Sequence, residues 1–228
     1  MSARPVLLSA QDLPPRPRQR RSQAKRDRLI RAALALFGEK GYEATSIDAI
    51  AGRAGLAVGT FYQHFRSKRQ LLLCLMDDLL ARLGAVQLRP APRDDGRDGR
   101  RALRGVLTVA FARDLEYLGA YRAWQEAVLA DGDLKRKGVA IHQWTTARIV
   151  AVLQYLQTFP LARPRVDVAG LADVLDGFFW SLLGRATQME RIELERWIDA
   201  ATHLIYHAMF TDAPAPPRMP RRRRRASN

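Results

Sequence analysis

Apolar residues near the N-terminus recur with the period of an α-helix. From Ser22 to about Gly38 they are spaced three and four positions apart, which predicts an amphipathic helix. The apolar positions are Leu29, Ile30, Ala33, Leu34 and Phe37. Gly38 or Gly41 is expected to end this helix, because glycine tolerates the backbone angles that follow a helix C-terminus.

Two short helices and one longer helix are predicted next. Thr45 or Ser46 caps the first short helix, which stops at Gly55 after about two turns. The run 58–65 predicts the second short helix. An apolar stripe over 67–83 predicts the longer helix, with a serine at its start as the cap.

The segment 58–65 has an apolar side and a polar side. Phe61 and Phe65 are four residues apart and therefore share one face of the helix. The polar side chains, which are expected to point elsewhere, are Thr60, Tyr62, Gln63 and His64. Two short helices joined at a glycine turn match the helix-turn-helix that places its second helix in the major groove of DNA. Gly59 would let the backbone of that helix approach a phosphate.

The rest of the chain repeats the helical period. Helices are expected at 102–118, 121–130, 134–158, 166–187 and 192–211. The breaks between them are expected at Gly119, Gly132, Pro160, Pro164 and Arg191. Since no segment shows sustained alternation of apolar and polar residues, the sequence predicts an all-α fold, with a helix-turn-helix domain followed by a helical bundle.

Composition divides the chain into four parts. Residues 1–21 hold prolines among arginines and little apolar material, which predicts a disordered basic arm. The helix-turn-helix domain is expected over 22–66, and a helix from about residue 67 links it to a helical domain over 67–212. Within that domain, residues 84–101 are expected to be a loop. A disordered tail rich in proline and arginine is expected over 213–228.

The net charge of +15 is concentrated at the two ends of the chain. Residues 1–101 hold 20 Lys and Arg against 10 Asp and Glu, whereas residues 102–217 are close to neutral and the last eleven residues add six arginines. A basic domain joined to a neutral body favours a polyanionic partner, with double-stranded DNA as the first candidate. No apolar run is long enough for a membrane span, and the single Cys74 fits a reducing compartment. The protein is therefore expected in the cytoplasm, associated with the nucleoid and without a membrane partner.

One stretch of the chain reads "IRAALALFGEKGYEATSIDAIAGRAGLAVGTFYQHFRSKRQLL", from Ile30 to Leu72. This stretch resembles the N-terminal domain of the TetR (tetracycline-repressor-type) transcriptional regulators. It shares "LF" and "GY" at the end of the first helix, "SIDAIAGRAG" in the second, and "GTFYQHFRSK" from the third into the fourth. The resemblance implies a dimeric DNA-binding repressor that a small, largely apolar ligand releases from a palindromic operator.

The resemblance also implies roles for the matching polar residues. Ser46 would cap the second helix and reach a phosphate, and Lys68 would bind a phosphate at the start of the fourth. The side chains expected to face DNA are Thr60, Tyr62 and His64. Hydroxyl, phenol, imidazole and ammonium groups can all donate hydrogen bonds to phosphate oxygens.

The start of the third helix departs from the family pattern. Where the family usually has serine and then a basic or polar residue, this chain has Ala57 and Val58. A usual cap is therefore missing, and Val58 is expected to contact a thymine methyl group instead. Gln63 is expected to address a base edge.

The two C-terminal segments, 166–187 and 192–211, have wide apolar faces. The residues are Leu171, Leu175, Phe178, Phe179 and Leu182 on the first, and Trp197, Ile198, Ala201, Leu204, Ile205 and Ala208 on the second. An ordinary intramolecular core is one explanation. In the TetR family this pair forms a four-helix bundle across a two-fold axis, so the resemblance implies a homodimer through these segments, which a palindromic operator also requires.

Aromatic residues gather between the loop and the last helix. Each alone favours a core position, but together they could line an apolar pocket, and the resemblance implies such a pocket for a small-molecule effector. The candidate ligand-binding residues are Phe111, Tyr117, Tyr121, Trp124, His142, Trp144, Arg148, Phe178 and Trp180.

No cofactor, metal site or catalytic site is predicted. His203 and His207 are four residues apart, but no carboxylate that would complete a metal site accompanies them. An all-helical enzyme acting on an anionic substrate is one alternative, although the sequence offers no catalytic constellation for it. A second alternative is a constitutive or architectural DNA-binding protein without an inducer, attracted to DNA through its arginine-rich ends.

Overall fold

The computed structural model describes residues 3–9, 12, 14, 19–85, 99–159, 161–186 and 189–211. Over these ranges the chain is all-α, as predicted, with one isolated antiparallel bridge between Ala162 and Phe210. The predicted tail at 213–228 and most of the predicted loop at 84–101 lie outside the described residues. Over the same ranges, no helix is long and apolar enough to cross a membrane.

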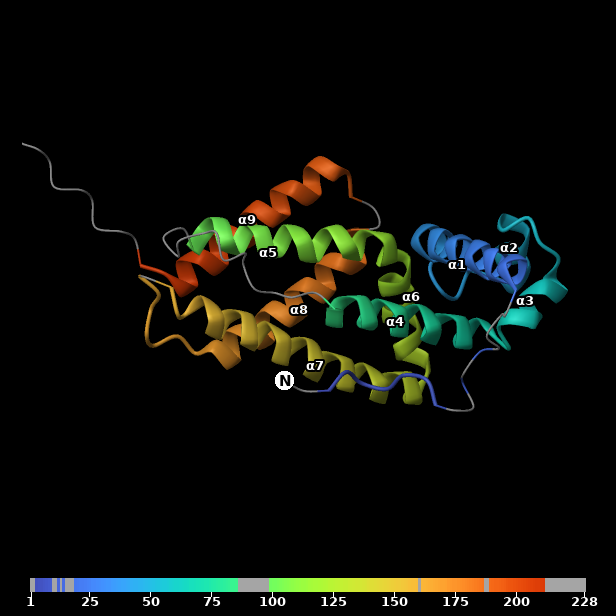
Figure 1. Ribbon diagram of the computed structural model, residues 1–228, viewed down its shortest axis with the longest axis horizontal. Coiled ribbons are helices and arrows are strands. Elements are labelled where there is room, and N and C mark those ends of the chain that lie inside the picture. Colours follow the sequence, from blue (N-terminus) through green and yellow to red (C-terminus); the bar gives the residue numbers. More distant parts are fainter. Residues whose placement is uncertain are drawn as a thin grey trace, which may run out of the picture.

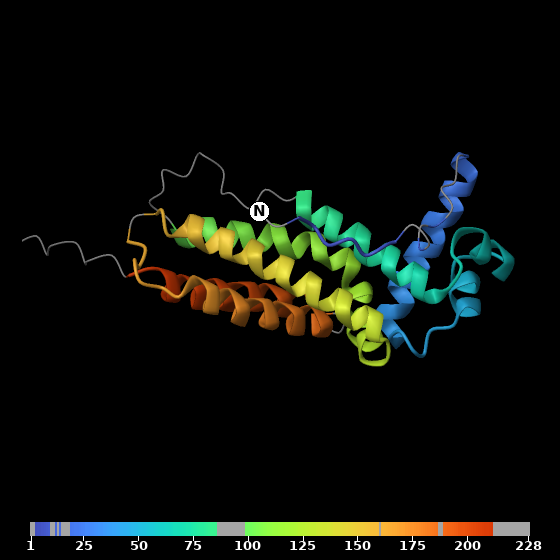
Figure 2. The same ribbon diagram turned by 90° about the horizontal axis from the view of Figure 1, so that it is seen from below.

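The helices form a small N-terminal group at one end of an elongated molecule and a longer bundle at the other (Figure 1, Figure 2). The N-terminal group consists of α1 (Arg20–Lys40), α2 (Ile47–Arg53) and α3 (Val58–His64). The bundle consists of α5 (Gly99–Asp114), α7 (Gly132–Leu156), α8 (Val168–Ala186) and α9 (Arg191–Met209). Two helices connect the groups: α4 (Lys68–Ala85), and α6 (Leu118–Ala130) with the short 3-10 helix η1 (Leu115–Tyr117) before it. Of these, α6 packs on both α1 and α8.

The ends of the N-terminal helices follow the sequence signals. Ser46 Oγ accepts a hydrogen bond from the backbone N–H of Ala49 at 3.1 Å, which confirms Ser46 as the cap of α2. Ser67 Oγ accepts from the N–H of Gln70 at 3.1 Å at the start of α4. Gly41 ends α1 with φ +84°, a left-handed value that favours glycine.

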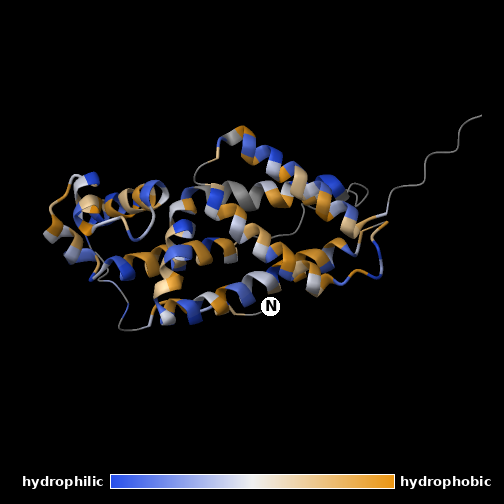
Figure 3. Ribbon diagram, turned by 180° about the vertical axis from the view of Figure 1, so that it is seen from behind, coloured by the Kyte–Doolittle hydropathy of each residue, from blue (hydrophilic) through white to orange (hydrophobic). Residues whose placement is uncertain are grey.

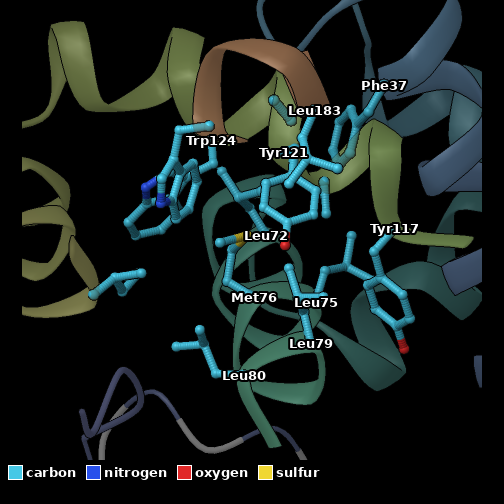
Figure 4. Close-up of a cluster of buried hydrophobic side chains, with 14 of the residues drawn as sticks. Phe37, Leu72, Leu75, Met76, Leu79, Leu80, Tyr117, Tyr121, Trp124 and Leu183 are labelled. Carbon is cyan, nitrogen blue, oxygen red and sulfur yellow. The ribbon is translucent and has the colours of Figure 1, made fainter. Parts of the chain in front are cut away.

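Helix α4 is the centre of the hydrophobic core. It is largely hydrophobic along its length (Figure 3) and buries the continuous run 70–76 as well as Leu79 and Leu80. Figure 4 shows its side chains between Phe37 of α1, Tyr121 and Trp124 of α6, and other apolar residues. A helix that reaches from one group of helices into the other is covered on several sides, and this explains why its apolar residues are not confined to one stripe.

The prediction that Gly119 separates two helices is wrong. The regular helix is interrupted at η1 instead, and Gly119 lies in the first turn of α6. Its backbone lies directly against that of α1, where an added Cβ would stand 1.9 Å from the carbonyl oxygen of Leu34. Glycine is therefore required here for close approach between two helices rather than for a turn.

The first part of the arm at 1–21 is not disordered as predicted. Leu7 is fully buried in the hydrophobic core, and Arg4 Nη1 donates to the carboxylate of Asp77 in α4 at 2.6 Å. The end of the arm also differs from the prediction, since α1 begins at Arg20 rather than near Ser22. Local composition gave no sign of these contacts, because they join residues more than 60 positions apart.

Candidate functional site

A tight turn between α2 and α3 presents α3 at the end of the molecule. Gly55 adopts φ +62° in this turn, and the N–H of Leu56 donates to the carbonyl of Ala51 at 2.9 Å. Arg28 of α1 donates to the carbonyl of Gly55 at 3.2 Å and ties the turn to the first helix. The predicted helix-turn-helix geometry is thereby formed, with glycine at the position that requires a left-handed backbone.

Helix α3 has the two faces that its sequence predicts. Phe61 and Phe65 are fully buried, with ring centroids 5.7 Å apart. Tyr62 is 53% exposed, and Gly59 and Gln63 are also exposed. Val58 and Thr60 are half-buried at the edge of this surface. We call the outward side of α3, formed by residues 58, 59, 60, 62 and 63, the recognition face.

The prediction that His64 faces outward is wrong. Its side chain is only 3% exposed, and its ring lies 6.5 Å from that of Phe65. His64 lies three residues after Phe61, and residues three apart on a helix share a face, so the imidazole is carried inward with the phenyl ring. It does not belong to the recognition face.

Buried His64 is expected to make the stability of the N-terminal domain depend on pH. Burial lowers the pKa of His64, and the positive charges of Arg26 and Lys25 lower it further. In the unfolded chain the imidazole has its ordinary pKa of about 6.5, so below that pH the unfolded state binds more protons than the folded state. We expect the free energy of unfolding to fall as the pH drops below about 6.5. Urea unfolding from pH 7.5 to 5 should show a shallower decline in a His64→Leu variant, and equal slopes would contradict this role.

The two predicted phosphate ligands occupy different environments. Ser46 is exposed next to the recognition face while its hydroxyl caps α2. The ammonium of Lys68, in contrast, donates to the carbonyls of Tyr42 at 2.7 Å and Thr45 at 3.0 Å. It also lies 4.3 Å from the centroid of the Tyr42 ring. Lys68 therefore holds the turn between α1 and α2, and a phosphate contact for either residue stays a prediction.

Exposed positive charges flank the recognition face. Arg20, Arg21 and Lys25 are exposed on the first two turns of α1. The N-terminus of α1 and α3 lie at the same end of the molecule (Figure 2). This end therefore combines hydrogen-bonding side chains with cations, the combination that contacts to a nucleic-acid backbone and base edges require.

A cavity of about 160 Å³ lies inside the bundle, mainly between α5, α7 and α8. Of the predicted ligand-binding residues, those that line it are Tyr121, Trp144, Arg148 and Trp180. Aliphatic residues that the prediction missed complete its wall, among them Leu103, Leu107, Val152, Leu175 and Leu183. A cavity of this size fits a molecule comparable to benzene without rearrangement.

Four predicted pocket residues do not line this cavity, so a ligand-binding role for them stays a prediction. Trp124 is buried against α4 (Figure 4), and Tyr117 faces an open groove between α1 and α4. His142 projects from the outer side of α7, and Phe178 is half-buried with its ring centroid 5.8 Å from that of Trp197. The side chain of Phe111 lies outside the described part of the structure.

A buried carboxylate forms the polar point of the cavity wall. Asp176 is 5% exposed, and its two oxygens contact Thr145 Oγ1 and His142 Nδ1, both at 2.5 Å. Arg148 stands 5.0 Å from the Trp144 ring and donates to the carbonyl of Leu83 at 2.7 Å, and burial lowers its pKa. The prediction missed Asp176, although a single acid within the apolar segment "VLDGFF" was a visible signal.

The C-terminal helices leave apolar side chains on the surface. Much of their predicted apolar face is core, since Leu175, Leu182, Ile198, Ala201 and Ile205 are all buried. Other members remain accessible: Leu204 is 60% exposed, and Leu171, Phe178 and Trp197 are half-buried. Val174 of α8, 68% exposed, adds to them. We call this exposed set the α8/α9 apolar face.

The two histidines of α9 lie close together. The rings of His203 and His207 are arranged edge to face, with centroids 4.3 Å apart. Among the described residues, no group of three or more histidine, cysteine or acidic side chains is arranged to hold a metal ion.

The N-terminal domain matches a known family. Residues 29–75 match the family described as "Bacterial regulatory proteins, tetR family". The chain is 38% identical over 97 residues to the HTH-type transcriptional regulator TcmR of Streptomyces glaucescens, a match that covers 42% of this chain and 41% of TcmR. The chain therefore spans less than half the length of that relative. It is 24% identical over 220 residues to the regulator EthR of Mycolicibacterium smegmatis, covering 92% of this chain and 98% of EthR.

Solved structures share the fold of most of the chain. A gamma-butyrolactone receptor described as an ArpA-like protein superposes with a TM-score of 0.63 at 19% identity, covering 83% of this chain and 90% of the receptor. TylP, a TetR regulator from Streptomyces fradiae, superposes with a TM-score of 0.56 at 23% identity, covering 85% and 89% of the two chains. The family match covers only the N-terminal domain, whereas these structures also share the arrangement of helices in the bundle.

Proposed function

The chain belongs to the TetR family of transcriptional regulators, whose members are not enzymes, and from this premise we propose a specific function. The protein is a dimeric, sequence-specific DNA-binding repressor of the cytoplasm. It occupies a palindromic operator through the recognition faces of two α3 helices. A small, largely apolar ligand in the bundle cavity releases it from that operator.

The observation that carries this proposal is the presentation of α3. Two buried phenylalanine rings fix the inner side of the helix, so Tyr62 and Gln63 are held outward on a rigid support. In a helix-turn-helix protein, side chains at this position contact base edges while neighbouring groups contact phosphates. The exposed cations of α1 supply the sequence-independent attraction.

Gln63 is expected to contribute to base preference. Its amide can accept and donate at an adenine edge, so a Gln63→Ala variant should lose about 1–3 kcal/mol of discrimination at one operator position. The operator is obtained by selecting duplexes from a random pool with the purified protein. Binding is then measured on the selected site and on each single-base variant of it.

A charge variant outside the N-terminal domain serves as the control for this experiment. Lys135 is exposed on α7, and Lys135→Ala should leave base preference unchanged. Failure of the wild-type protein to enrich any duplex at low salt would contradict the proposed function as a whole. Equal preference profiles for Gln63→Ala and the wild type would contradict only the assignment of this residue.

The α8/α9 apolar face supports the proposed dimer. Val174 and Leu204 lie on the surface of a single chain, where contiguous apolar residues favour a protein partner. Self-association across a two-fold axis would cover them and pair two recognition faces, which a palindromic operator requires about 34 Å apart, one turn of the DNA helix.

The cavity supports the proposed ligand class. Its lining is mostly aliphatic and aromatic, with Asp176 and Thr145 at one point where a polar group of the ligand could bind. One solved structure of similar fold is a gamma-butyrolactone receptor, which gives a precedent for small-molecule recognition by this architecture. Suppose that the bundle has two conformations and that only one of them binds DNA. A ligand with higher affinity for the other conformation would then shift the equilibrium away from the DNA-binding form.

A further inference from the structure

The N-terminal residues form a strap across α4. Arg4 Nη1 donates to both the carboxylate and the carbonyl oxygen of Asp77, at 2.6 and 3.0 Å. Further along, the carbonyl of Asp12 accepts a hydrogen bond from Gln70 Nε2 at 2.9 Å. Between these two anchors Leu7 has no exposed surface. We call residues 4–9 and 12 the strap; its two anchors follow α4 in the antiparallel direction, over two turns of that helix.

A compact turn fixes the end of the strap. Asp12 Oδ2 accepts from the hydroxyl and the N–H of Ser9, at 2.7 and 3.3 Å. The bond from the Ser9 hydroxyl lowers the pKa of the Asp12 carboxyl, and the nearby charges of Arg69 and Lys137 lower it further. The end of the strap is therefore held near positive charges of both α4 and α7.

Gln70 connects the strap to the recognition helix. Its side chain is 5% exposed, and both ends of the amide are used: Nε2 donates to Asp12, while Oε1 accepts from the backbone N–H of Arg66 at 2.6 Å. Arg66 lies two residues after the end of α3. A buried amide with two hydrogen-bond partners has one preferred orientation. When the strap is bound, the Gln70 Oε1 atom is therefore held where it accepts from the N–H of Arg66, in the turn after α3.

We propose that Gln70 is a positioning residue for the recognition helix and that the N-terminal strap holds it in place. This inference rests on the proposed function, in which α3 contacts DNA. When the strap is bound to α4, Gln70 fixes the turn between α3 and α4, and the recognition face keeps one orientation. With the strap detached, the amide is free to turn, the N–H of Arg66 loses its fixed acceptor and affinity for the operator falls.

Uncharged substitutions test this proposal without changing the electrostatic attraction to DNA. Leu7→Ala removes most of the buried side chain that holds the strap on α4. Gln70→Met removes both hydrogen bonds of the Gln70 amide. Val6→Ala, at an 80% exposed position of the same segment, is the matched control. Two quantities are measured on the full-length protein: hydrogen exchange at the N–H of Arg66, and affinity for a duplex selected by the wild type at several salt concentrations.

Leu7→Ala and Gln70→Met are each expected to speed exchange at Arg66 and to weaken operator binding about tenfold, which corresponds to one lost hydrogen bond of about 1.4 kcal/mol. The salt dependence of binding should stay that of the wild type, and the double variant should be no weaker than Gln70→Met alone, because both changes act through one contact. Val6→Ala should bind DNA as the wild type does.

Wild-type exchange at Arg66 in the Leu7→Ala variant would overturn the proposal, as would additive losses of affinity in the double variant. A change in salt dependence would also overturn it, because it would indicate that the strap acts through direct contact with phosphates. If the wild type selects no duplex, the proposed function fails, yet the exchange measurement still decides whether the strap fixes the turn after α3.

Discussion

Replacing Gly119 with alanine is expected to destabilise the protein by about 3 kcal/mol and to lower its Tm by roughly 6–12 °C. An added Cβ would lie 1.9 Å from the carbonyl oxygen of Leu34 and 3.0 Å from the backbone nitrogen of Gly38. Both atoms belong to the backbone of α1, so they cannot turn away as a side chain would. The variant must therefore separate α6 from α1, and the higher helix propensity of alanine, about 1 kcal/mol, does not offset that loss.

Gly105 offers a matched control for this substitution. It lies in α5, and apart from its own helix backbone no atom of the described residues stands within 4 Å of the position where its Cβ would be. Gly105→Ala should therefore leave the Tm unchanged or raise it slightly, since alanine favours a helix more than glycine does. Thermal unfolding followed by circular dichroism compares the two variants. Equal Tm values for both would contradict the close contact between α6 and α1.

The helices were predictable from local signals, whereas contacts between distant segments were not. The serine caps and the three-and-four spacing of apolar residues placed α1, α2, α3 and α4 close to their observed limits. Gly119 was misassigned because glycine marks either a turn or a close approach, and only the position of α1 distinguishes them. Leu7 was missed for a similar reason: a run of three apolar residues in a proline-rich segment has no helical periodicity, and its burial depends on residues far away in the sequence.

The recognition face was more predictable than the cavity. Buried Phe61 and Phe65 defined the inner side of α3, and the only error there was His64, where a polar side chain follows the apolar face. The cavity has no comparable signal, because aromatic residues of the bundle serve equally as core and as lining. Trp144 lines the cavity while Trp124 packs against α4, although both recur at helical spacing.

Helix α6 joins the cavity to the N-terminal domain. On one side Tyr121 lines the cavity, and Gln125 donates to the carbonyl of Trp180 in α8 at 2.9 Å. On the other side Arg122 donates to the carbonyl of Gly38 at 2.7 Å, at the end of α1. A rigid helix with one face at each site would move both together, which is the physical requirement for coupling between them.

Glu126 adds a charged contact between α6 and the N-terminal domain, and its removal is expected to uncouple the two parts of the molecule. Its carboxylate accepts from the N–H of Tyr42 at 2.6 Å and from that of Glu43 at 3.4 Å. In Glu126→Ala the partly buried N–H of Tyr42 loses a charged acceptor, which costs about 1.5–3 kcal/mol. Because this contact holds the turn after α1 to α6, the loss should fall on the N-terminal domain and leave the bundle nearly unaffected.

The distribution of tryptophan makes this uncoupling measurable. The four tryptophans, at 124, 144, 180 and 197, all lie outside the helix-turn-helix domain, so their fluorescence reports unfolding of the bundle, whereas circular dichroism reports every helix. In the wild type the two thermal transitions should coincide. In Glu126→Ala the dichroism signal should begin to fall at a lower temperature than the fluorescence signal. In Glu126→Gln, which keeps an acceptor oxygen, the two transitions should lie close together again. Coincident transitions in Glu126→Ala would show that the domains unfold together without this carboxylate, and coupling would then have to rest on the apolar packing of α4 and α6.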